Sequence, residues 1–80
     1  MRGGLKVLSG AEVVDILIGF GFGVTIGKKH VKLRRAGPNG DETLIVPKHA
    51  SLAKGTLRAI YSQASRYIPQ VDLHPHFYNE

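Results

Sequence analysis

The 80-residue chain contains no cysteine. This absence excludes a disulfide scaffold, a thiolate metal site and a cysteine nucleophile. The fold must therefore be held together by packing alone or by a partner. Proteins of a reducing compartment rarely carry disulfides, so the composition agrees with a cytoplasmic protein, which is what we expect.

Long apolar runs are missing as well. The longest purely aliphatic runs are three residues, Ile16–Ile18 and Leu44–Val46, whereas a membrane-spanning helix needs about 20 apolar residues. Residues 1–8 lack the apolar stretch of a signal peptide. We therefore expect a soluble, intracellular protein with no membrane partner.

Acidic residues are few. Six of them stand against eleven Lys and Arg residues, which gives a formal net charge of +5. A basic balance of this size favours a polyanionic partner, such as nucleic acid or an acidic protein. A chain of this length forms one small domain that buries roughly 60% of its unfolded surface. Its functional site is therefore expected on the surface or in a groove.

Two segments have helical periodicity. Ser9 and Glu12 form the pattern of a capping box, and the apolar residues that follow keep helical spacing until Gly19. A second helix is expected over residues 54–65, where apolar residues again recur at helical spacing. Residues 48–52 are expected to form a linker before it. Pro69 ends the second helix or opens a short one through Leu73, and the aromatic tail beyond it has no clear period. Phe77 and Tyr78 of this tail are expected to pack on the sheet edge or on a partner.

Three short segments between these helices read as strands, at residues 24–26, 30–35 and 43–46. They are β-branched or alternate between apolar and polar residues. The tetrapeptide at residues 37–40, Gly-Pro-Asn-Gly, is a strong turn signal. The last two strands are therefore expected to form a hairpin with a longer loop.

This order of elements predicts an α+β fold, α-β-β-β-α, with a three-stranded antiparallel sheet and two helices on one face. Double-stranded-RNA-binding domains share this order, and they recognise RNA shape rather than base sequence. We expect residues 1–80 to form a single domain, with a flexible start at 1–8 and a C-terminal extension at 69–80.

The most informative stretch is Lys28–Arg35, which holds five of the eleven Lys and Arg residues. Val31 and Leu33 alternate with polar residues, so a strand here would turn an apolar face to the core and a polar face outward. The polar face would carry a titratable imidazole at His30 beside fixed positive charges. A histidine can move a proton near neutral pH, and Lys and Arg side chains can hold phosphate.

Phosphodiester chemistry on RNA needs this combination, although a half-buried strand with a polar outer face is the plainer explanation for any single charge. The candidate phosphate-binding residues of the stretch are Lys28, Lys29, Lys32 and Arg34. Lys54 and Arg58, near the start of the second helix, are further candidates, because a phosphate docked on the free helix amides would favour cations there. Lys54 and Arg58 are explained equally well as exposed cations that cost the helix little stability.

The remaining histidines suggest less. His74 and His76 lie two residues apart, but no Cys, Asp or Glu constellation accompanies them. We therefore expect no metal ion and no other cofactor.

The motifs taken together resemble the HicA family, the toxins of type II toxin–antitoxin pairs. The matching stretches run in the same order through nearly the whole chain, and they are 9–14 (Ser-Gly-Ala-Glu-Val-Val), 21–22 (Gly-Phe), 30–34 (His-Val-Lys-Leu-Arg), 45–47 (Ile-Val-Pro) and 54–60 (Lys-Gly-Thr-Leu-Arg-Ala-Ile). Residues 63–69 and the closing Phe77-Tyr78 resemble one branch of the family. No single motif is decisive, but their order and spacing are specific.

The resemblance implies a double-stranded-RNA-binding-like fold and an RNA endonuclease, an mRNA interferase, held inactive by a HicB-like antitoxin. The family's catalytic histidine sits in a Gly-Ser-His motif, and it corresponds to His30. The Gly and Ser correspond to Lys28 and Lys29, which is a departure from the motif. This departure adds charge and removes a flexible hinge.

Three functions therefore compete at this point. The first is a metal-independent endoribonuclease that cleaves single-stranded mRNA, with His30 as proton acceptor or donor. The second is an RNA-binding module of the same fold without catalysis. The third is a partner protein whose basic face only docks on an acidic antitoxin.

Overall fold

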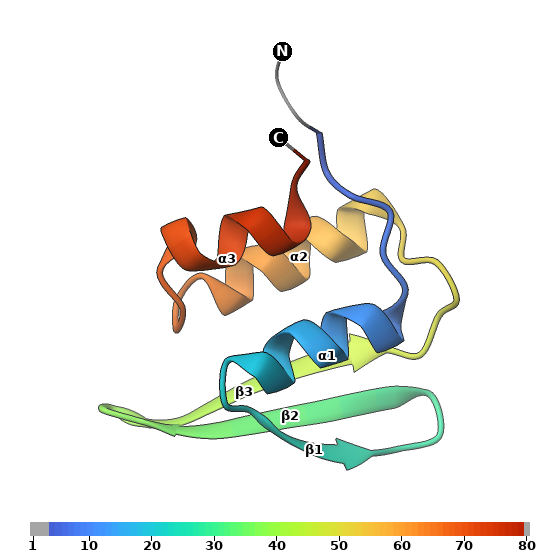
Figure 1. Ribbon diagram of the computed structural model, residues 1–80. Coiled ribbons are helices and arrows are strands. Elements are labelled where there is room, and N and C mark those ends of the chain that lie inside the picture. The colour runs from blue at the N-terminus through green and yellow to red at the C-terminus, as the bar shows by residue number, and fades with distance from the viewer. Residues whose placement is uncertain (1–3, 80) are drawn as a thin grey trace.

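The structure is a computed structural model that describes residues 4–79. Three strands form one antiparallel sheet in the order β1-β2-β3, and the helices gather on one side of it (Figure 1). The predicted α+β fold class is confirmed. The elements are α1 (Gly10–Gly19), β1 (Gly23–Ile26), β2 (His30–Gly37), β3 (Gly40–Pro47), α2 (Lys54–Ala64) and α3 (Gln70–Phe77).

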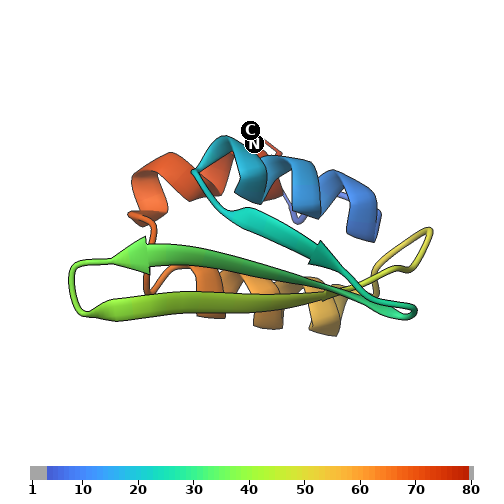
Figure 2. The ribbon, with the colours of Figure 1, turned by 90° about the horizontal axis from the view of Figure 1, so that it is seen from below.

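The helices form the second layer of the domain. Seen from below, the sheet lies across the front of the molecule and every helix lies behind it (Figure 2). The two expected helices, α1 and α2, cover the sheet, and α3 lies on their far side (Figure 1). The opposite face of the sheet is left open. No helix within the described part of the chain is long and apolar enough to cross a membrane.

The start of α1 is fixed by side-chain caps and by a close approach to the sheet. The expected capping box is confirmed: the Ser9 hydroxyl accepts from the Glu12 amide at 3.0 Å, and the Glu12 carboxylate accepts from the Ser9 amide at 2.8 Å. The Gly10 amide donates to the His49 carbonyl at 2.9 Å. A Cβ at Gly10 would collide with the Pro47 carbonyl, so a glycine is needed there.

The hairpin of β2 and β3 is longer than the sequence pattern indicated. Pairing runs from His30↔Pro47 to Gly37↔Gly40, so Pro38 and Asn39 alone form the loop. The expectation of a longer loop was therefore wrong. Pairing continues to the turn because Gly40 adopts a φ of +120°, which only glycine reaches without strain.

The core lies between the sheet and the helices, and the C-terminal segment completes it. The residues expected to lack a period form a helix, α3, which passes through Pro75 and places Leu73 and Phe77 fully out of solvent. Phe77 packs edge-on against Tyr61 of α2, at 5.4 Å between ring centroids. The tail had been expected at a sheet edge or on a partner, and this placement corrects that expectation.

The predicted flexible start falls partly outside the described residues, which begin at Gly4. Residues 4–6 run beside the C-terminal end of the chain. The Lys6 amide donates to the Phe77 carbonyl at 2.7 Å, and Leu5 forms an isolated antiparallel bridge with Tyr78. The flexibility of residues 1–8 stays a prediction.

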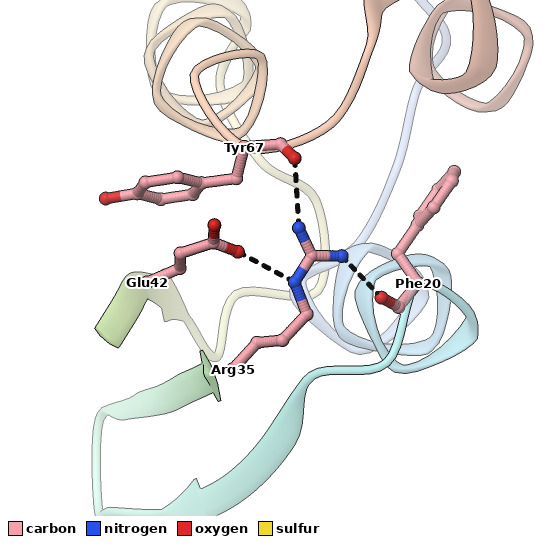
Figure 3. A network of polar contacts seen from close by, with 4 residues as sticks. All are labelled: Phe20, Arg35, Glu42 and Tyr67. Carbon is pink, nitrogen blue, oxygen red and sulfur yellow. Dashed lines mark hydrogen bonds and ion pairs between the residues drawn. The ribbon is translucent and has the colours of Figure 1, made fainter. Parts of the chain in front are cut away.

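Arg35 ties the two layers together. Alternation along β2 turns this residue toward the helices, on the same face as Val31 and Leu33. Its guanidinium donates to the Glu42 carboxylate at 2.7 Å, to the Phe20 carbonyl at 2.7 Å and to the Tyr67 carbonyl at 2.9 Å (Figure 3). One side chain thus joins the sheet to the end of α1 and to the segment after α2.

Replacing Arg35 with Ala should destabilise the fold strongly. Glu42, which is only 8% exposed, would lose its cationic partner, and two backbone carbonyls would lose a charged donor. We expect a loss of about 2–4 kcal/mol in the free energy of unfolding, measured from urea denaturation midpoints. The neighbouring Arg34→Ala variant is the matched control, because its ion pair is exposed and should cost under about 1 kcal/mol. Equal losses in both variants would contradict the special role of Arg35.

Candidate functional site

His30 stands at the first position of β2, directly after a tight turn. The Lys28 and Lys29 side chains project from that turn, whose ends are joined by a hydrogen bond of 2.8 Å from the Gly27 amide to the His30 carbonyl. All three side chains are exposed. His30 is therefore held by a short, hydrogen-bonded turn and reaches solvent next to two ammonium groups.

Lys48 ties this turn to the end of β3. Its side-chain ammonium donates to the Gly27 carbonyl at 2.8 Å, and its backbone amide donates to the Lys29 carbonyl at 2.9 Å. The second bond continues the β2–β3 ladder one residue past His30. Lys48 thereby adds a positive charge to the same end of the sheet and restrains the loop that precedes His30.

Lys32 and Arg34 follow His30 along the open face of the sheet, and both are exposed. Lys32 is flanked by Thr25 of β1 and Ile45 of β3, neither of which carries a charge. Arg34 forms an ion pair with Asp41 at 3.1 Å, in which both side chains are about three-fifths exposed. Lys32 is therefore the freer of the two cations, since a phosphate at Arg34 competes with Asp41.

Lys54 and Arg58 lie in the helix layer, on the covered side of the sheet. Figure 1 shows α2 starting at the same end of the molecule as the turn between β1 and β2. The N-cap residue of α2, Ala53, makes no side-chain hydrogen bond to the helix amides. The structure thus brings Lys28, Lys29 and Lys32 together with His30, and it sets Lys54 and Arg58 apart from them.

The two tail histidines take part in aromatic packing. His74 stacks on Tyr78 at 4.4 Å between ring centroids, and His76 meets Phe20 edge-on at 5.4 Å. Within residues 4–79, no group of three or more potential ligands is placed to hold a metal ion. These histidines therefore contribute to the α3 interface.

Sequence reasoning missed Lys48, which was expected to be part of the linker at residues 48–52. The signal was the turn at Pro38 and Asn39. A two-residue loop fixes the register, and counting back from it along both strands places Lys48 opposite Lys29, as the backbone hydrogen bond between them shows.

The fold and this face define the class of protein. The domain is an α+β sandwich of the double-stranded-RNA-binding type, with α1, three antiparallel strands and α2 in the expected order and a basic polar face left open. The chain also matches the family described as the HicA toxin of bacterial toxin–antitoxin systems, over residues 10–65. It belongs to the HicA family, and it is a toxin-type protein of a toxin–antitoxin pair.

No curated protein and no solved structure gives a significant match to the chain. The family match ends at residue 65, so α3 lies outside the matched region. The helix nevertheless belongs to the same core, because Leu73 and Phe77 are fully buried in it.

Replacing Lys48 with Met should loosen the turn before His30. Methionine keeps an apolar stem of similar length but removes the hydrogen bond to the Gly27 carbonyl. Amide hydrogen exchange at Gly27 should accelerate roughly three- to tenfold, as expected for the loss of about 0.7–1.4 kcal/mol. The Lys54→Met variant makes the same change on α2 and should leave exchange at Gly27 unaltered. Unchanged exchange in both variants would show that Lys48 does not restrain the turn.

Proposed function

We propose that this toxin is a metal-independent endoribonuclease that cleaves single-stranded mRNA in the cytoplasm, with His30 as its catalytic group, and that a HicB-like antitoxin neutralises it. The observation that supports this proposal most directly is the position of His30. It is an exposed imidazole at the end of a strand, on the face without helices, beside Lys28 and Lys29 and two residues before Lys32.

The proposed reaction uses the RNA's own 2′-hydroxyl as the nucleophile. His30 accepts the hydroxyl proton while the 2′-oxygen forms a bond to phosphorus and the bond from phosphorus to the 5′-oxygen breaks. The leaving 5′-oxygen takes a proton from His30 or from water. The products are a 2′,3′-cyclic phosphate and a 5′-hydroxyl end. One proton-transfer group typically accelerates a reaction by about 10²–10⁴-fold, which suits slow cleavage of message.

The lysines have two tasks in this proposal. Lys29 and Lys32 offset the negative charge that develops on the phosphorane, and Lys28 and Arg34 hold neighbouring phosphates along the strand. Lys54 and Arg58 would meet only an RNA segment that passes around the end of the sheet toward α2. The contribution of these two residues is therefore expected to be smaller.

A non-catalytic RNA-binding module is the second candidate. The observation in its favour is the pair Lys28 and Lys29, which stands where the family's Gly-Ser-His motif has smaller residues. These lysines strengthen phosphate binding, but they occupy the turn that sets the position of the imidazole. Binding of RNA without cleavage would support this second candidate.

The decisive experiment compares the wild-type chain with His30→Ala on a long unstructured RNA. Cleavage should fall by roughly 10²-fold or more, because the proton acceptor is lost. RNA binding should persist, since the lysines remain. Stability should change by less than about 0.5 kcal/mol at such an exposed position. His49→Ala is the matched control and should cleave like the wild type.

Three further readouts belong to the same experiment. The matching DNA should stay intact, because it has no 2′-hydroxyl, chelators should have no effect, and new 3′ ends should carry a cyclic phosphate. Equal cleavage by wild type and His30→Ala would remove His30 from the mechanism, and inhibition by chelators would contradict metal independence.

Replacing Lys32 with Gln should weaken RNA binding for all sequences. One phosphate contact is lost, so the slope of log K against log salt should become shallower by about 0.7–1 unit. Arg66→Gln removes an exposed charge near the other end of the sheet and should leave the slope unchanged. The measurement is a salt titration of binding to a fluorescent RNA. All three proteins carry the His30→Ala substitution, so that the RNA stays uncut. Equal slopes for all three proteins would place the RNA elsewhere.

A further inference from the structure

An apolar groove runs between α1 and β1, on the helix side of the sheet. Its volume is about 460 Å³, and its walls include Ala11 and Val14 of α1, Val24 and Ile26 of β1, and Val31 of β2. Its polar lining residues are Ser9, Asp15, Lys48 and His49. The groove exists because α1 and α2 cover β2 and β3 but leave β1 largely bare: Ile26 is 70% exposed and Val24 is 37% exposed.

The outer edge of β1 is open. In the sheet that the described residues form, β1 pairs with β2 on one side only. The strand, Gly23–Ile26, carries no charge and no proline, which are the usual devices that keep an edge from pairing with another chain. The outer edge of β1 thus presents unpaired backbone N–H and C=O groups together with apolar side chains to another chain.

The two faces of the sheet beside β1 have opposite character. Val24 and Ile26 face the groove, because they pair with the buried Leu33 and Val31. Thr25 faces the open side, where it pairs with Lys32. Side chains alternate along a strand, so a strand added to β1 would place one set of residues in the groove and the other beside Thr25, about 10 Å from β2 and its cations.

We propose that β1 is the docking edge for an extended segment of an acidic partner protein, in which apolar residues alternate with Asp or Glu. The apolar set fills the groove, and the carboxylates lie on the open face toward Lys32 and the turn lysines, Lys28 and Lys29. Strand addition supplies backbone hydrogen bonds for affinity, and the two faces supply specificity.

This inference deepens the proposed function and rests on it in one respect: the partner that would use this edge is the antitoxin. A bound acidic strand neutralises the cations that hold RNA next to His30. The partner therefore blocks cleavage by competing for Lys28, Lys29 and Lys32, without having to touch the imidazole itself.

The other occupants fit less well. RNA has no apolar side chains for a groove lined by Val14, Val24, Ile26 and Val31, and the groove offers it few polar groups. A second copy of the chain would bring a net charge of +5 against another +5 and place two lysine-rich turns near the same interface. Charge complementarity thus favours an acidic protein segment.

The test uses the full chain, labelled with ¹⁵N, and a blocked octapeptide of alternating valine and glutamate. Amide shifts should gather on β1, on the facing residues of α1 and on Lys48. A serine–glutamate octapeptide lacks the apolar set and should bind at least tenfold more weakly, and a valine–lysine octapeptide should not bind.

Two variants separate apolar contact from charge. Ile26→Glu and Ile26→Lys should both raise the dissociation constant of the valine–glutamate peptide at least tenfold, because each places a charge in the groove. If binding were electrostatic alone, Ile26→Lys would bind the acidic peptide more tightly. Val71→Glu, on the exposed side of α3, is the charge-matched control and should stay within twofold of the wild type.

The outcomes distinguish this inference from the proposed function. Ile26→Glu should still cleave RNA at the wild-type rate, and the valine–glutamate peptide should inhibit the wild type but not this variant. Peptide shifts confined to the His30 face, shifts of groove residues with a short RNA, or a concentration-dependent dimer through β1 would each overturn the docking proposal. Absence of cleavage with intact peptide binding at β1 would overturn only the nuclease function.

Discussion

The contact between Arg35 and Glu42 constrains the whole domain, because a guanidinium and a carboxylate withdrawn from water need all their partners in place. Arg35 takes those partners from the neighbouring strand, from the end of α1 and from the segment after α2 (Figure 3). The network therefore holds the register of β2 against β3 and ties the sheet to the segments that follow α1 and α2. A slip by one residue would turn Lys32 or Arg34 into the core, so the same contact keeps the basic face of β2 in solvent.

The candidate site depends on chain segments that meet at the other end of the sheet. The turn that carries Lys28 and Lys29 is closed by a backbone hydrogen bond and held by a second hydrogen bond from Lys48. Gly10 of α1 contacts the 47–49 segment that bears Lys48. His30 is thus presented by a restrained loop that also carries Lys28 and Lys29. In the proposed reaction, this restraint reduces the freedom that the imidazole loses on reaching the transition state.

The uneven cover of the sheet gives the molecule two surfaces of different chemistry that share one strand. The open face is polar and basic, and it suits phosphate. The groove between α1 and β1 is mainly apolar, with Lys48 among its lining residues, and it suits a protein segment. Because both surfaces border the turn before His30, occupation of one changes the electrostatics of the other within a Debye length of about 8–10 Å. A partner protein bound at the groove would therefore alter the electrostatic potential at the basic face.

Local sequence rules determined most of the secondary structure and one face of the site. The capping box at Ser9, the alternation that exposes His30 and buries Val31, and the order of helices and strands all depend on near neighbours, so they can be predicted without the fold. Pairing across the sheet and packing between layers decided the rest. Residues 70–77 form a helix despite Pro75 because the core gains the large buried ring of Phe77. Arg35 becomes a structural residue because its guanidinium donates to carbonyls of distant segments. Lys48 joins the site because the strand register sets it opposite Lys29. Each of these depends on residues far apart in the chain, and only the tertiary structure brings them together.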